Sequence, residues 1–227
     1  MESSIFFGVF ISLGAYGIGL WLRRKTGSAL ANPLLVSIIL VCAFLLLTGT
    51  SYETYCEGSQ FISYLLTPAT VCLAVPLYEQ FQLLRRNPRA IMAGIVAGTL
   101  ASLSSVLLLS LVARVSHESY VTLLPKSITT AIGLGVSEQL GGIVPVTVVS
   151  IVITGVLGNV FAEQFLRLIR VHHPIARGIA IGTATHAVGT ARAMEMGQIE
   201  GAMSVLSIVV AGLLTVILAP LFAAVSF

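Results

Sequence analysis

Six long stretches of the chain contain no Asp, Glu, Lys or Arg, and they constrain the fold more than any other feature. They are Ser3–Leu22, Thr26–Tyr52, Gly58–Tyr78, Ala90–Ala113, Gln139–Ala162 and Gly201–Phe227. Each reaches the roughly 20 apolar residues that an α-helix needs to cross the hydrocarbon core. Only 9% of the residues are charged, against about 25% in a soluble domain. We therefore predict an all-α, polytopic membrane bundle with about six full spans, in one domain of residues 1–227.

The positions of the charges predict how the chain crosses the membrane. Basic clusters follow the first, third and fifth of these stretches: Arg23, Arg24 and Lys25; Arg85, Arg86 and Arg89; Arg167, Arg170 and Arg177. The positive-inside rule then puts these loops in the cytoplasm and the N-terminus outside. Because Glu2 precedes the first stretch and basic residues follow it, the polarity is wrong for a cleaved signal peptide. We expect a protein of the bacterial inner membrane.

Two further segments are too polar, or too interrupted by glycine and proline, to be plain spans. They are Val121–Val136 and Ile179–Gly197, and they lie on either side of the span Ile143–Phe161. If both are re-entrant, the first enters from outside and the second from the cytoplasm, as in an inverted repeat. Such a pair is typical of transporter sites that are built from discontinuous helices. We expect helix breaks at Pro68, Pro76, Pro125, Gly141, Gly142, Gly182 and Gly189.

The side chains of these two segments favour a small carboxylate as ligand. Lys126 supplies a positive charge and the neighbouring hydroxyls supply donors within about one helical turn. A helix that begins near Pro125 would also aim free backbone N–H groups at an anion. His186 can in addition accept a proton near neutral pH. The candidate substrate-binding residues are Lys126, Ser127, Thr129, Thr130, Thr183, Thr185, His186 and Thr190.

Each of these residues also has a purely structural interpretation. Threonines in membrane helices commonly hydrogen-bond to their own backbone, Lys126 can extend toward the membrane interface, and a buried neutral His186 can bond to a neighbouring helix. Arg192 and Glu195 are three residues apart, so they either form a charge pair or contribute to gating.

The chain shows no C-x-x-C or Cys/His metal motif, no nucleotide loop and no nucleophile–base pair. We expect no metal, no cofactor and no enzyme activity, and the weak basic excess gives no reason to expect nucleic acid.

Several motifs, in order, resemble those of the LrgB/CidB family of membrane proteins. They are Asn32-Pro33-Leu34-Leu35, Pro68-Ala69-Thr70-Val71, Pro76-Leu77-Tyr78, Leu124–Thr130, Gly141-Gly142-Ile143 and Gly182–Arg192. The resemblance covers nearly the whole chain. It departs at Ala131, where family members often carry proline after the paired threonines, and this difference puts the local helix break in doubt.

The resemblance implies two different functions. Bacterial members are described as antiholin-like or holin-like and are linked to murein hydrolase activity and cell lysis. Plant relatives export glycolate and glycerate from plastids, and bacterial relatives are tied to pyruvate uptake. The plant form is fused to an LrgA-like half that is absent here, so a separate LrgA/CidA-like membrane partner is implied, and we expect a homo-oligomer, with a dimer favoured. The concentration of polar groups in two broken segments favours an alternating-access carrier for small monocarboxylates, of the elevator type, over a direct permeability regulator.

Overall fold

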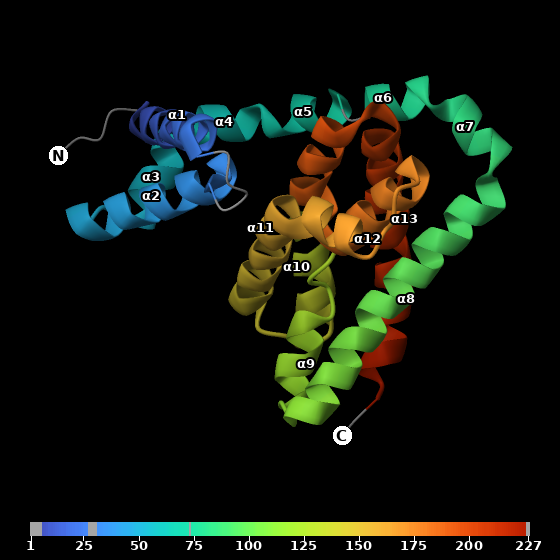
Figure 1. The fold of residues 1–227 in the computed structure, drawn as a ribbon. Coiled ribbons are helices and arrows are strands. Elements are labelled where there is room, and N and C mark those ends of the chain that lie inside the picture. Colours follow the sequence, from blue (N-terminus) through green and yellow to red (C-terminus); the bar gives the residue numbers. More distant parts are fainter. Residues whose placement is uncertain (1–5, 27–30, 73, 226–227) are drawn as a thin grey trace. The chain divides into compact units, whose positions relative to one another are not determined.

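The computed structural model describes residues 6–26, 31–72 and 74–225. The regular secondary structure of these residues is helical, without strands, so the predicted all-α fold is confirmed (Figure 1). The chain divides into two compact units, Met1–Leu73 and Ala74–Phe227, which are described separately below. That residues 1–227 act as one domain stays a prediction.

Unit 1 is built on a helical hairpin. Its helices are α1 (Phe7–Thr26), α2 (Pro33–Thr48), α3 (Tyr52–Gly58), α4 (Gln60–Tyr64) and α5 (Leu66–Cys72). Asn32 caps α2, because its Oδ1 accepts a hydrogen bond from Leu34 N at 2.9 Å, and Pro33 is the first helical residue. A Cβ atom at Gly19 of α1 would lie 2.8 Å from the Cα atom of Pro33. Glycine therefore permits the close approach of α1 and α2.

The predicted number of about six full spans is not confirmed and stays a prediction. Within the described residues, three helices are long and apolar enough to cross a membrane: α8 (Pro88–Ala113), α11 (Val144–Leu168) and α13 (Gln198–Ala223). The predicted span Gly58–Tyr78 is divided among α4, α5 and α6 (Ala74–Glu79). Pro68 and Pro76 are the third residues of α5 and α6. Proline fits the first turn because the N–H groups there have no partner within the helix.

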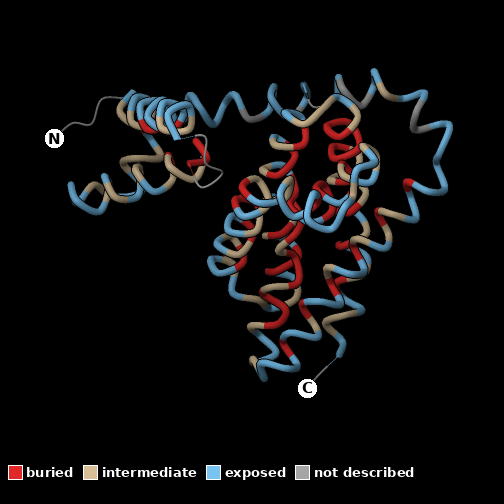
Figure 2. The backbone as a smooth tube through the Cα atoms, in the orientation of Figure 1, coloured by how far each residue is buried: buried red, intermediate tan, exposed pale blue. Residues whose placement is uncertain are grey.

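Unit 2 is a bundle around the three long helices. Its other elements are α6, α7 (Phe81–Arg86), α9 (His117–Leu123), α10 (Thr130–Gln139) and α12 (Pro174–Met196). One part of the core joins α8, α12 and α13, with Ile91, Ile95, Ile179 and Met203 buried against one another. Figure 2 shows that the buried residues lie along the inward faces of these helices. The outward faces carry large apolar side chains, as lipid requires.

The helix α12 is a hairpin rather than a continuous helix. Its backbone is non-helical at His186, with φ 44° and ψ −146°. The first arm, residues 174–185, runs parallel to α13, because Gly178 contacts Glu200 and Gly182 contacts Ser204. The second arm, residues 187–196, runs antiparallel to α13, because Thr190 bonds Ser204 and Met194 contacts Gly201. The chain therefore enters the unit, reverses at His186 and returns to the end from which it came.

The helices α9 and α10 form a second hairpin, which enters from the opposite end. Along α9 the chain runs antiparallel to α8, because Tyr120 packs with Val106 and Ser127, past the end of α9, bonds Ser102. Along α10 it runs antiparallel to α11: Gly133 faces Ile151, and Ser137 bonds Thr147 at 2.6 Å. Residues 124–129 make the reversal. We call α9–α10 hairpin 1 and α12 hairpin 2.

Candidate functional site

The tip of hairpin 1 carries the predicted lysine. Lys126 Nζ donates a hydrogen bond of 2.9 Å to Ser127 Oγ. Ser102 Oγ, on α8, donates to the same Ser127 oxygen at 2.9 Å. Lys126 is half-buried, and among the described residues no carboxylate forms an ion pair with it. Within the described part of the chain, Lys126 at this tip therefore has a hydroxyl partner and no counter-charge.

Two further hydroxyls lie at the start of α10, also at this tip. Thr129 is the N-cap residue of α10 and makes no capping hydrogen bond, and Thr130 is the first helical residue. Both side chains are half-buried. One turn further along the helix, Gly133 packs against Ile151 of α11. The uncapped helix start has unsatisfied N–H groups and the positive end of the helix dipole, both of which favour an anion.

The threonines of hairpin 2 bond to the backbone of their own helix. Thr183 Oγ1 donates to Ile179 O at 2.8 Å, and Thr185 Oγ1 donates to Ile181 O at 2.7 Å. Thr190 Oγ1 donates to His186 O at 2.9 Å and also bonds Ser204 Oγ of α13 at 2.6 Å. All three are buried. Each hydroxyl keeps an acceptor lone pair for a further partner, but in this arrangement its hydrogen is used within the protein.

Two side chains fix the reversal of hairpin 2 to α11. His186 Nε2 lies 2.9 Å from Ile151 O, and because a carbonyl only accepts, the ring nitrogen carries the proton. In the opposite direction, Asn159 Nδ2 of α11 donates to Val188 O at 2.7 Å. The His186 ring fits where α11 has Gly155, since a Cβ atom there would lie 2.7 Å from the ring. His186 therefore anchors one helix to another.

The two hairpins come together on α8 and on α11. On α8, a Cβ atom at Gly98 would lie 2.7 Å from Thr183 Oγ1 of hairpin 2, and Ser102 bonds Ser127 of hairpin 1. Positions 98 and 102 are one turn apart, or about 6 Å. On α11, both hairpins contact Ile151. The opposed tips therefore meet at the same depth of unit 2.

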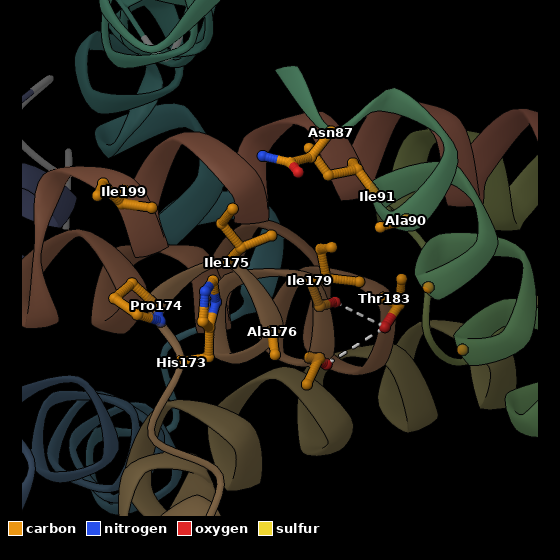
Figure 3. A pocket seen from close by; sticks show the side chains of 13 residues that line it. Asn87, Ala90, Ile91, His173, Pro174, Ile175, Ala176, Ile179, Thr183 and Ile199 are labelled. Atoms are coloured by element: carbon orange, nitrogen blue, oxygen red, sulfur yellow. Dashed lines mark hydrogen bonds between the residues drawn. The ribbon is translucent and has the colours of Figure 1, made fainter. Parts of the chain in front are cut away.

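The predicted site residues do not share a single cavity. A cavity of about 750 Å³ lies between α8 and the first arm of α12, and Thr183 lines it (Figure 3). A second cavity of about 420 Å³, between α11 and α12, is lined in part by Thr185. Lys126 lines a third, of about 200 Å³, between α8 and α9. The structure thus places Thr183 and Ser127 against the same face of α8 and leaves Lys126 in a neighbouring space.

The expected helix breaks at Gly182 and Gly189 are wrong, since α12 breaks between them at His186. These glycines instead permit close packing: a Cβ atom at Gly182 would collide with Ser204 O of α13, and one at Gly189 with the Thr185 side chain. Gly141 and Gly142 do lie in the non-helical link between α10 and α11, and Gly141 has φ 74°. Pro125 lies in the reversal of hairpin 1.

Charged side chains surround the open end of hairpin 2. Arg192 pairs with Glu195 of the same arm and with Glu163 of α11, and Glu163 also pairs with Arg167 at 2.5 Å. The predicted pairing of Arg192 with Glu195 therefore forms, within a larger network. Among the described residues, no group of three or more His, Cys, Asp or Glu side chains is placed to hold a metal.

Three polar residues of the site were not among the predicted ones: Ser102, Asn159 and Ser204. Each one bonds a hairpin, through Ser127, the Val188 carbonyl and Thr190 respectively. Their signal was available in the sequence, because each is a polar residue within a long uncharged stretch. In a membrane span such a residue usually faces protein and bonds to a neighbouring helix.

The fold and the site define a helical membrane protein in which two helical hairpins enter the bundle from opposite ends. The sequence profile of the LrgB-like family matches residues 12–225. The chain is 39% identical over 225 residues to the antiholin-like protein LrgB of Bacillus subtilis (strain 168), covering 98% of this chain and 97% of the relative. It is 38% identical over 218 residues to the protein of the same name from Bacillus cereus (strain B4264), covering 96% and 95%. The chain therefore belongs to the LrgB-like family. No solved structure matches it.

Proposed function

We propose that this protein is a secondary carrier for small monocarboxylates such as pyruvate, glycolate or glycerate. The observation that carries the proposal is the meeting of hairpins 1 and 2, from opposite ends of unit 2, on Ile151 of α11 and on adjacent turns of α8. Discontinuous helices that meet near the middle of a bundle are the usual framework of a carrier site. A pore needs no such pair of reversals.

The chemistry of the tips fits a carboxylate. Two half-helices begin at this depth, α10 at Thr130 and the second arm of α12 after His186. Their N-terminal N–H groups and positive dipole ends favour an anion. Lys126 adds a full charge, and the hydroxyls of Thr129 and Thr130 can donate to a carboxylate or to a neighbouring hydroxyl or keto oxygen. A coupling proton on His186 remains part of this proposal.

A second candidate function comes from the relatives. Those compared above are named antiholin-like proteins, and this name favours a regulator of envelope permeability and cell lysis over a carrier. The two functions are compatible if a changed carboxylate balance alters autolysis. We also propose a cell-membrane location with the loops at Arg86 and Arg170 in the cytoplasm, an LrgA-like membrane partner, and a dimeric assembly.

Transport by the purified protein in liposomes distinguishes the two candidate functions. The carrier proposal predicts saturable uptake of labelled pyruvate, glycolate or glycerate, with no leakage of labelled sucrose from the same vesicles. Leakage of sucrose without saturable acid uptake would support the permeability regulator and contradict the carrier. Each assay is run with and without a co-reconstituted LrgA-like protein. The comparison measures whether transport requires this proposed partner.

A further inference from the structure

The largest of the three cavities leads toward the meeting point of the hairpins. Its volume of about 750 Å³ falls within the roughly 300–1,000 Å³ that is typical of small-molecule pockets. An acid as small as glycolate would fill only part of it, so the cavity also has room for water. The walls along Ile91, Ile175 and Ile179 are apolar, with Asn87 and His173 at one end and Thr183 at the other (Figure 3). This arrangement suits a passage more than a fitted site.

The outer end of the cavity favours anions over cations. Both helices that form it begin there with proline, α8 at Pro88 and α12 at Pro174. The N-cap side chains, Asn87 and His173, make no capping hydrogen bond to either helix. The free backbone N–H groups in the first turns of α8 and α12, and the positive ends of these two helix dipoles, therefore lie at the mouth of the cavity. The exposed Arg89 adds a charge of the same sign in the first turn of α8.

At the inner end of the cavity, α8 and the first arm of α12 approach each other closely. Gly94 leaves ordinary space, since a Cβ atom there would lie 3.5 Å from the Ile179 methyl groups. One turn deeper, at Gly98, the same atom would lie 2.7 Å from Thr183 Oγ1. The next turn carries Ser102, which bonds Ser127 beside Lys126. The contact between Gly98 and Thr183 thus lies between the cavity and the tip of hairpin 1.

We propose that this cavity is the vestibule through which a small monocarboxylate reaches the hairpin tips, and that the Gly98–Thr183 contact is the constriction at its inner end. The inference rests on the carrier function proposed above and adds its access route and a size-determining position. The acid enters beside Asn87 and His173, passes along α8, and reaches Ser127 and Lys126 when the first arm of α12 moves away from Gly98.

Cysteine labelling tests the vestibule. Ala176 lines the cavity, whereas Ala93 is exposed on α8 and does not line it. Each is changed to cysteine in a chain whose native Cys42, Cys56 and Cys72 are serine and whose acid transport is measured first. The probe is a membrane-impermeant sulfonate-bearing methanethiosulfonate, which needs water at the thiol. We expect Ala176→Cys to react faster than Ala93→Cys, and excess glycolate, but not the neutral glycolamide, to slow its labelling.

The outcomes separate this inference from the carrier proposal. Equal reaction of the two cysteines, or no protection by glycolate in a chain that transports, would overturn the vestibule and leave the carrier standing. Protection by glycolate in a chain that does not transport would support the vestibule and count against the carrier. Slow labelling at Ala93→Cys in both solutions is the expected background.

Substitution at Gly98 tests the constriction. Gly98→Ala places a methyl group against Thr183, so we expect acid uptake to fall by on the order of tenfold or more, because small displacements at a site have large effects on rate. Gly94→Ala should lose less, and Gly135→Ala, where a Cβ atom meets nothing within 4 Å, should transport normally. Adding Thr183→Ala to Gly98→Ala should recover part of the uptake. Unfolding temperatures of all variants are compared. A folded Gly98→Ala that transports like Gly135→Ala would overturn the constriction.

Discussion

His186 lies at the reversal of hairpin 2 in a backbone conformation that is unfavourable for a non-glycine residue. A non-glycine residue at φ 44° and ψ −146° costs about 1–3 kcal/mol. Its hydrogen bond to Ile151 O is of a kind that contributes only about 0.6 kcal/mol on average between membrane helices. That bond alone does not offset the cost. The ring also packs against Gly155, and Asn159 and Thr190 form hydrogen bonds beside it, so these contacts add support to the reversal.

Gly155 should therefore be intolerant of a methyl group. A Cβ atom there would lie 2.7 Å from the His186 ring and 2.9 Å from Val188 Cβ, and overpacking of this kind costs about 1–3 kcal/mol. We predict that Gly155→Ala lowers the unfolding temperature in detergent. Gly135→Ala is the control: it is helical with open space around it, so it should be neutral or more stable by up to about 1 kcal/mol. Equal shifts for both variants would contradict the anchoring role of His186.

Hairpin 2 also shows which part of an element the sequence can predict. The polar, glycine-rich composition of Ile179–Gly197 predicts a broken segment, and the structure has a break in it; that the segment is re-entrant stays a prediction. The break itself was placed at the glycines, yet it occurs at His186. The reason is tertiary: Gly182 and Gly189 are needed for contact with Ser204 and Thr185, whereas a histidine has no local preference for this backbone conformation.

The reversal of α12 gives a prediction about sidedness. If residues 174–196 form a hairpin, His172 before it and Gln198 after it lie on the same side of the membrane, while Glu138 at the end of hairpin 1 lies on the other. We expect an impermeant thiol reagent to label His172→Cys and Gln198→Cys from one side and Glu138→Cys from the opposite side. Labelling of His172→Cys and Gln198→Cys from opposite sides would mean that α12 crosses the membrane once.

The class of the whole molecule, an all-helical membrane bundle, could be predicted from the sequence, whereas the number of full spans stays a prediction. Counting uncharged residues identifies membrane segments without detecting where a helix stops. In Gly58–Tyr78 the chain changes helix between α4 and α5, although no charge marks the change. Conversely, the long helices α8, α11 and α13 agree with the stretches expected from composition, because each stays apolar over the length that a membrane span needs. Breaks depend on packing partners that are distant in sequence.

The sequence could predict which residue types form the candidate site, but it could not predict which of these residues come into contact. Lys126 and the hydroxyls beside it stand out in an apolar chain because polar groups at this depth are costly. That Ser127 meets Ser102, and Thr183 meets Gly98, depends on the register of α8 against both hairpins. No local pattern in the sequence specifies that register.

If the opposed hairpins hold a carboxylate as proposed, substitution of Lys126 should weaken its binding. The measurement is saturable uptake of labelled glycolate and pyruvate into liposomes by the wild type, Lys126→Ala, Lys126→Arg and, as a control in unit 1, Lys25→Ala. A charge-assisted hydrogen bond contributes about 1.5–3 kcal/mol, so Lys126→Ala should lose roughly ten- to hundredfold in affinity. Lys126→Arg should recover only part of it, because a planar guanidinium does not replace a compact ammonium. Lys25→Ala should match the wild type. Uptake by a folded Lys126→Ala protein with wild-type affinity would contradict carboxylate binding at the hairpin tips.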